Sequence, residues 1–227
     1  SFSFYKNEEV FASVLNDEIF CKHESYKGSN DIEIRLNHSQ LVEPIARCKR
    51  MSLDQKQVMS AAASIREAYE AKSPIAALRN SYNMEIDDAY AVQEENTKHW
   101  LKQGRLLSGR KIGVTSHAVQ SQLGVDQPDF GMLFSDMAFA DGQEISMSHL
   151  LQPRIEGEIA FYLGKDLDSP GITLAEVLSA IEYAVAAIEV VDSRIANWDI
   201  QITDTIADNA SSGLYVLGSR PVKLDAF

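Results

Sequence analysis

The chain has 227 residues, of which 45% are hydrophobic and 24% are charged, and its formal net charge is −12. A chain of this length and apolar content can bury a substantial core, as one large domain or two small ones. The negative charge argues against a protein that binds nucleic-acid phosphates, and no stretch has the pattern of a transmembrane helix or a signal peptide. We therefore expect a cytoplasmic protein that binds neither nucleic acid nor membrane.

Residues 1–50 are polar, show weak periodicity and contain both cysteines, Cys21 and Cys48. Two cysteines do not make a disulfide framework, and Cys21 with His23 is too sparse a set for a zinc site. We treat residues 1–50 as a leader without an assigned fold.

Residues 51–104 are expected to form a small helical subdomain. Ala, Met and Ile recur at helical spacing after Ser52, which suits the N-cap of a first helix. A second short helix is expected over residues 73–80. A third is expected over residues 85–104, where Gly104 suits the C-terminal cap.

From residue 105 onward the pattern changes to strands with interspersed helices. Apolar or β-branched runs predict strands over residues 106–116, 137–145, 154–163, 185–194 and 211–219. Helices are expected over residues 117–125 and from Thr173 to Tyr183, and the Pro, Asp and Gly of residues 126–134 favour a functional loop. The sequence therefore predicts an α+β fold, with a helical cap on a mixed β-roll.

Two glutamates stand one residue apart in the apolar run RIEGEIAFYL. Residues i and i+2 share a face of a strand, so Glu156 and Glu158 point the same way and repel each other. A third, Glu189, lies in another apolar strand, and three such carboxylates supply the hard oxygen ligands that suit Mg²⁺ or Mn²⁺. The alternatives are a solvent-facing strand or, for Glu189, an ion pair with Arg154 or Arg194.

Further polar residues are candidates for the same site. Lys111, between apolar residues of a strand, is either an anion-binding cation beside the acidic cluster or an exposed strand lysine. Asp129 is either a site residue or a turn-forming aspartate. Asp208, Asn209 and Ser211 precede a strand, where a capped turn is the ordinary explanation. The sequence has no glycine-rich phosphate loop, no GxSxG motif and no Cys/His nucleophile pattern.

Three segments together carry a resemblance to a known family: GRKIGVTSHAVQSQLGVDQPDFGMLFSDM, LQPRIEGEIAFYL and AAIEVVDSRIANWDIQITDTIADNASSG. In this order they resemble the hydratase/decarboxylase branch of the fumarylacetoacetate hydrolase superfamily, over a range from about Met51 to about Gly218. The resemblance implies a helical subdomain at 51–104 and a partial β-roll at 105–227. Since members of the family continue beyond the position of Phe227, we expect the roll to be incomplete at its C-terminus.

The resemblance also implies a chemistry, namely metal-dependent hydration of 2-hydroxypenta-2,4-dienoate to 4-hydroxy-2-oxopentanoate in aromatic meta-cleavage catabolism. It assigns Mg²⁺ or Mn²⁺ to Glu156, Glu158 and Glu189, catalysis to Lys111 and Asp129, and substrate contact to Ser211. Decarboxylation of 4-oxalocrotonate, hydration of a seven-carbon dicarboxylate and a truncated non-catalytic relative remain alternatives. The resemblance further implies a homo-oligomer and association with another enzyme of the meta-cleavage route.

Overall fold

The computed structural model describes residues 52–123, 125, 127–167 and 171–226, together with the backbone of five short strands within residues 1–50. The protein combines helices with two open sheets, so the α+β class expected from the sequence is confirmed. Within the part of the chain that the structure describes, no helix is both long enough and apolar enough to cross a membrane.

The larger sheet has seven strands in the order β7-β6-β1-β9-β10-β11-β8. Their bounds are β1 Phe2–Tyr5, β6 Leu107–Gly113, β7 Asp129–Phe134, β8 Ala138–Ala140, β9 Pro153–Leu163, β10 Ile181–Asp192 and β11 Ser212–Leu217. The smaller sheet consists of β2 Phe11–Leu15, β3 Glu18–Lys22, β4 Ile32–Leu36 and β5 Ile45–Ala46. The division of the chain at residues 50 and 104 stays a prediction.

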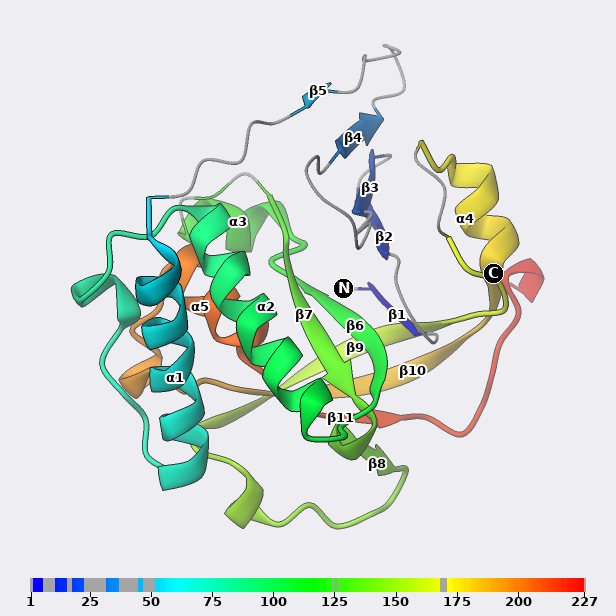
Figure 1. Cartoon of the computed structure of the whole chain (residues 1–227). Helices are drawn as coiled ribbons and strands as arrows, with labels where there is room; N and C mark the ends of the chain where they lie inside the picture. The colour runs from blue at the N-terminus through cyan, green and yellow to red at the C-terminus, as the bar shows by residue number, and fades with distance from the viewer. Residues whose placement is uncertain are drawn as a thin grey trace.

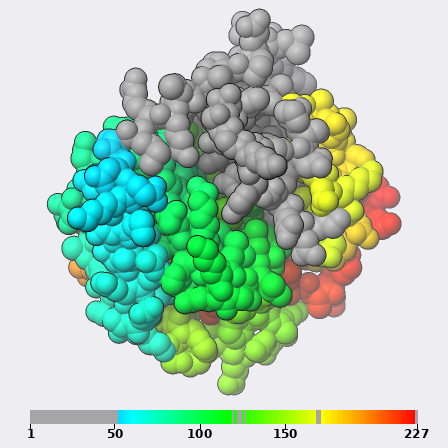
Figure 2. All heavy atoms as spheres, viewed as in Figure 1, coloured from blue at the N-terminus to red at the C-terminus, as the bar shows by residue number. Residues whose placement is uncertain are grey.

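The residues that the structure describes form five α-helices and six short 3₁₀ turns in addition to the sheets. The helices are α1 Gln55–Ala71, α2 Ile86–Lys102, α3 His117–Leu123, α4 Leu174–Ala180 and α5 Ile202–Ala207. The 3₁₀ turns are η1 Leu78–Asn80, η2 Ser135–Met137, η3 Met147–His149, η4 Ala196–Trp198, η5 Asn209–Ser211 and η6 Leu224–Ala226. Helices α1 and α2 lie side by side, and α4 lies far from them near the C-terminus (Figure 1). Figure 2 shows the cyan and green atoms of α1 and α2 as one continuous surface.

The longest strands, β9 and β10, form an antiparallel pair in the middle of the larger sheet. Alternate residues of a strand face opposite sides, and both strands follow this pattern. Ala160 and Val185 are opposite each other in the register and both belong to the buried core of this sheet. On the other face Ile155, Ile159 and Ile188 are exposed.

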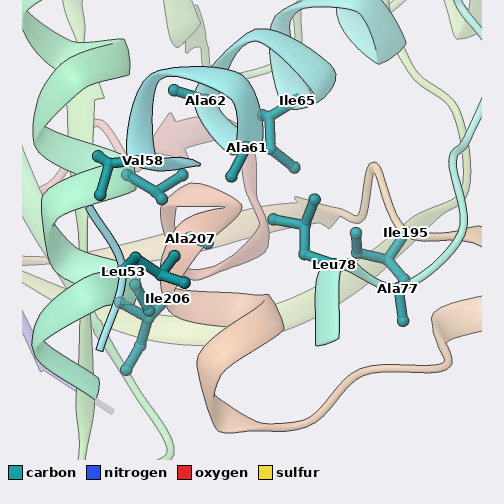
Figure 3. Packing of buried hydrophobic residues seen from close by; sticks show 12 residues of the cluster. Leu53, Val58, Ala61, Ala62, Ile65, Ala77, Leu78, Ile195, Ile206 and Ala207 are labelled. Carbon is teal, nitrogen blue, oxygen red and sulfur yellow. The ribbon is translucent and has the colours of Figure 1, made fainter. Parts of the chain in front are cut away.

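The helical layer has a separate apolar core, and α5 lies within it. Val58, Ala61 and Ile65 of α1 pack in one cluster with Leu78, Ile195, and Ile206 and Ala207 of α5 (Figure 3). Gln93 of α2 reaches from this layer to the sheet, because its Nε2 donates to the carbonyls of Phe130 in β7 and Ile206 in α5 at 2.8 and 3.0 Å. This packing fixes the position of α5 relative to β7.

The ends of the helices correct two details of the sequence-based expectation. Asp54, not Ser52, caps α1, since the Asp54 carboxylate accepts from Gln57 N at 2.8 Å. Ser52 instead donates to the buried carboxylate of Asp88 in α2, from its backbone N and from its Oγ. Helix α2 ends at Lys102, with Gln103 as its cap, and Gly104 follows with a φ of +90°.

Two boundaries in the sheet also differ from expectation. Residues expected to form a functional loop include strand β7, which begins at Asp129. Thr173 caps α4 as predicted, but the helix ends at Ala180 because Ile181 already pairs with Leu163 of β9. Sheet pairing therefore overrides the local helical pattern of the residues that follow Ala180.

Candidate functional site

Three glutamates meet on one face of the β9–β10 pair. In the register Glu156 lies directly opposite Glu189, and Glu158 lies opposite Ala187, so all three side chains share a face. One carboxylate oxygen from each lies within 4.8 Å of the others. Glu156 is exposed, Glu158 is partly buried and Glu189 is only 5% exposed. The cluster is therefore open to solvent on the Glu156 side and closed at Glu189.

The pKa of Glu189 is raised to about 7, mainly by burial; the Lys111 ammonium opposes this rise, and the nearby carboxylates of Glu156 and Glu158 add to it. Among the described residues no hydrogen bond reaches Glu189 Oε1. A buried carboxylate oxygen that lacks a donor and faces two other carboxylates is suited to a cation.

Lys111 extends from β6 towards this cluster. Its Nζ donates to the carbonyl oxygen of Ala210 at 2.9 Å and lies 3.4 Å from Glu189 Oε1, a contact longer than a good hydrogen bond. Burial acts to lower the pKa of Lys111, but Glu189, Asp129 and Glu156 outweigh it and raise that pKa. Lys111 is therefore a buried cation, and the exposed strand lysine considered from the sequence is excluded.

Asp129, the first residue of β7, is 1% exposed, and its carboxylate lies near the Lys111 ammonium. Burial raises the pKa of this carboxyl, and the neighbouring Lys111 opposes the shift. Its Oδ2 accepts a weak hydrogen bond from Thr205 Oγ1 at 3.4 Å, and no described residue donates to Oδ1. A Cβ at Gly113 would lie 2.3 Å from Asp129 Oδ1 and 3.1 Å from Lys111 Nζ, so only glycine leaves room for both groups.

Ser211 is joined to Asp129 through Thr205. Its Oγ lies 3.2 Å from Thr205 Oγ1, and both side chains are buried. The structure thus brings all six candidate residues into one continuous group of contacts, running from the glutamates through Lys111 to Asp129, Thr205 and Ser211. Their roles as ligands and catalysts stay predictions.

The alternative partners for Glu189 are engaged elsewhere. Arg194 forms a fully buried ion pair with Asp208, and Arg154 lies over the ring of Trp198 at 4.2 Å. Asp208 is thereby a structural residue, with its pKa raised by burial to about 6 against the opposing effect of Arg194. The ion pair that Glu189 does form is with Lys111.

Sequence reasoning missed Thr205, Gly113 and the carbonyl of Ala210. Thr205 gave no signal because its contact with Asp129 depends on how α5 packs against β7. Gly113 stands two residues after Lys111 on the same strand face, a spacing that does indicate a close approach. A backbone carbonyl has no sequence signature.

The raised pKa of Glu189 predicts how the stability of the metal-free protein depends on pH. The folded-state pKa of Glu189, about 7, lies above its ordinary value of 4.5. The protonated carboxyl therefore makes its full contribution to the free energy of unfolding below about pH 4.5, and this contribution is lost as the pH rises through 7. In EDTA, we expect the free energy of unfolding of the wild type to fall by about 3 kcal/mol between about pH 4.5 and pH 8, relative to that of Glu189→Gln. Thermal unfolding of both proteins across this range measures the difference, and parallel pH profiles would contradict it.

No protein-family model matches the chain. Individual relatives do match it. The protein named "TodF product hydratase" from Pseudomonas putida F1 is 57% identical over 171 residues, 75% of this chain and 64% of that protein. The protein named 2-keto-4-pentenoate hydratase 1 from Dechloromonas aromatica RCB is 57% identical over 166 residues, 73% of this chain and 63% of that protein. The chain therefore spans just under two thirds of the length of these curated relatives.

Solved structures give a consistent result. The 4-oxalocrotonate decarboxylase from Pseudomonas putida G7, complexed with magnesium and adipate, is 34% identical and superposes with a TM-score of 0.75 over 78% of this chain and 68% of that one. The same enzyme complexed with calcium and acetate gives 33% identity and a TM-score of 0.73. With this coverage and identity, the chain belongs to the hydratase/decarboxylase branch of the fumarylacetoacetate hydrolase superfamily.

Proposed function

We propose that this chain carries the metal-binding and proton-transfer groups of a hydratase that adds water to 2-hydroxypenta-2,4-dienoate and gives 4-hydroxy-2-oxopentanoate. The observation that carries the proposal is the cluster of Glu156, Glu158 and Glu189, whose oxygens lie within 4.8 Å of one another beside the Lys111 ammonium. The names of relatives at 51–57% identity, which are 2-keto-4-pentenoate or 2-hydroxypent-2,4-dienoate hydratases, support the choice of substrate.

The cluster fits a divalent ion. It offers three hard carboxylate oxygens, and the buried Oε1 of Glu189 receives no hydrogen bond from the described residues. Magnesium and calcium in the two decarboxylase complexes support a divalent cation at this site, and ligand chemistry alone extends the proposal to Mn²⁺. When bound, the ion would act as a Lewis acid for negative charge on the adjacent oxygens of the substrate.

Lys111 provides a fixed positive charge beside the metal ligands. An ammonium has three N–H donors; one is given to Ala210 O, and the group also faces Glu189. A third donor is left for a substrate oxygen. We assign Lys111 to binding the substrate anion and stabilising the ionised dienol, since a buried cation interacts strongly with nearby negative charge.

Asp129 is the group that we assign to proton transfer. The reaction requires a proton at the far end of the diene and water at C4, so it needs one group that can both give and take a proton. The raised pKa of Asp129 brings its protonation closer to neutral pH, and Oδ1 is the oxygen without a donor from the described residues. The other carboxylate oxygen, Oδ2, accepts a hydrogen bond from Thr205 Oγ1, which is itself hydrogen-bonded to Ser211 Oγ.

The proposal also covers the architecture and the oligomeric assembly of the protein. We infer that the seven-stranded sheet is part of a β-roll of the superfamily type, preceded by a helical subdomain. We also propose a homo-oligomer that can associate with another enzyme of the meta-cleavage route. Analytical ultracentrifugation of the full chain tests directly whether it forms a homo-oligomer.

The second candidate is decarboxylation of 4-oxalocrotonate, which the similarity to the decarboxylase complex with adipate favours. The hydratase has the stronger support, because relatives named as hydratases are 51–57% identical whereas the decarboxylase is 34% identical. A dicarboxylate would need a second cation for its second carboxylate, and the site described above contains one buried cation, Lys111.

Turnover with defined metals distinguishes the two candidates. We expect the full chain to consume 2-hydroxypenta-2,4-dienoate with Mg²⁺ or Mn²⁺, to form 4-hydroxy-2-oxopentanoate, and to lose about 10²-fold or more of its activity in EDTA. Ultraviolet absorbance follows the dienol, and chromatography identifies the product. Release of carbon dioxide from 4-oxalocrotonate without hydration of the dienol would favour the decarboxylase instead.

A further inference from the structure

Three consecutive residues beside the site have left-handed backbone conformations, and none of them is glycine. Asn209, Ala210 and Ser211, which form η5, have φ values of +57°, +51° and +51°. L-residues with a side chain are disfavoured in this region because Cβ approaches the following carbonyl. Such a conformation persists only where surrounding contacts hold it.

Arg194 supplies contacts on both sides of this turn. Its Nη2 donates to the carbonyl of Asp208 at 2.6 Å, and its Nη1 donates to the carbonyl of Ser212 at 2.9 Å. Its Nε forms the short ion pair with Asp208 Oδ1, and its backbone N donates to Asp208 Oδ2 at 2.9 Å. One guanidinium thus binds the residue before the turn and the residue after it, and both members of the ion pair are fully buried.

The turn is also tied to the sheet. Asn209 Oδ1 accepts from Met132 N at 2.7 Å, and Asn209 Nδ2 donates to Met132 O at 2.8 Å, which fixes the turn against β7. In this conformation the carbonyl of Ala210 receives the hydrogen bond from Lys111 Nζ at 2.9 Å. The direction of the Lys111 ammonium therefore depends on the conformation of the turn.

We propose that Arg194 is a positioning residue: its guanidinium holds the left-handed turn so that the Ala210 carbonyl anchors Lys111 beside Glu189. The catalytic consequence rests on the proposed function, whereas the anchoring itself does not. If Arg194 served only to form a stabilising ion pair, its contact with the Asp208 carboxylate would be enough. The two further hydrogen bonds, to the carbonyls that flank the turn, require the planar guanidinium with several donors, which lysine cannot replace.

The test compares Arg194→Lys with a matched control, Asp88→Asn. Asp88 is also a fully buried charged side chain with several hydrogen bonds, but it holds Ser52 and Leu53 at α2, away from the turn. The readouts are Tm, kcat/KM and the rate at which a lysine-acylating reagent modifies Lys111, measured by peptide mass spectrometry. We expect Arg194→Lys to speed modification of Lys111 and to lower kcat/KM, each about tenfold, as for loss of one hydrogen bond to a charged group.

Asp88→Asn is expected to lower Tm and to leave the modification rate of Lys111 unchanged. An unchanged modification rate in Arg194→Lys would overturn the proposal, as would an equal increase in both variants. If the wild type shows no turnover of the dienol, the proposed function fails, but the modification rates still decide whether Arg194 anchors Lys111.

Ala210→Gly provides an independent test, and it remains available if Arg194→Lys does not fold. Glycine adopts the left-handed conformation without the Cβ penalty, so Ala210→Gly alone should raise Tm. Added to Arg194→Lys, it should slow the modification of Lys111 towards the wild-type rate. Ala210 is only 2% exposed, so the variant also loses a buried methyl group. A fall in Tm larger than this loss accounts for would show that the turn is not held under strain, and the proposal would fail.

Discussion

Replacing Glu189 by glutamine is expected to remove divalent-metal binding and, with it, hydration of the dienol. Glu189 is the buried member of the carboxylate cluster, and glutamine keeps its shape while it removes the charge that a cation requires. Loss of groups that merely orient metal ligands weakens metal affinity 10–100-fold, so we expect the loss of a ligand to exceed about 100-fold. Calorimetric titration with Mg²⁺ and Mn²⁺ measures the affinity, and the dienol assay measures turnover.

Asp192→Asn is the matched control for this prediction. Asp192 lies on β10, as Glu189 does, and is equally buried, but its carboxylate accepts from the backbone N–H groups of Leu151 and Gln152 outside the cluster. The control should lower Tm and keep the metal affinity of the wild type. Metal binding by Glu189→Gln at wild-type affinity would refute the ligand assignment, whatever its activity.

Replacing Lys111 by methionine is expected to abolish turnover as Glu189→Gln does, but to keep metal binding. The ammonium lies 3.4 Å from Glu189 Oε1, so it competes with a divalent ion for the same negative charge. Its removal should leave metal affinity unchanged or stronger. Without the cation that holds the substrate anion and stabilises the ionised dienol, kcat/KM should fall about 10²–10³-fold.

Calorimetry and kinetics on the same preparation separate these two effects. Lys165→Met serves as the control, because Lys165 is an exposed lysine whose Nζ contacts Ser179 Oγ, in α4. Weaker metal binding in Lys111→Met would mean that the lysine organises the carboxylates rather than the substrate. Together, Glu189→Gln and Lys111→Met distinguish residues required to bind the metal ion from residues required for turnover once the ion is bound.

The metal-ligand candidates were predictable because strand periodicity is local. Alternation along RIEGEIAFYL places Glu156 and Glu158 on one face without any knowledge of the fold. The proximity of Glu189 needed the family resemblance, since the register that sets it opposite Glu156 is a tertiary property. The contacts of Ser52 and Thr205 were not predictable, because Asp88 and Asp129, their partners, are distant in the sequence.

Strand β7 illustrates why a correct local signal can predict the wrong structure. The glycine at residue 131 favoured a loop, yet a Cβ there would lie 2.5 Å from the carbonyl of Asn209 and 2.6 Å from Ser212 Oγ. Glycine is required because the turn that holds Lys111 approaches the strand closely, and this close approach has no signature separate from that of a loop.

The pairing of Glu156 with Glu189 makes metal binding a test of strand alignment during folding. A slip of one residue between β9 and β10 would put Glu156 and Glu158 on the opposite face from Glu189. A slip of two residues would keep the face but shift Glu189 by about 7 Å along the strand. In one direction this shift carries Glu189 away from both partners, whereas in the other it sets Glu189 opposite Glu158 and diagonal to Glu156. The one-residue slips are therefore the alignments that always separate the three carboxylates. A divalent ion that binds all three carboxylates would therefore raise the population of the native alignment, by mass action, over every alignment that separates them.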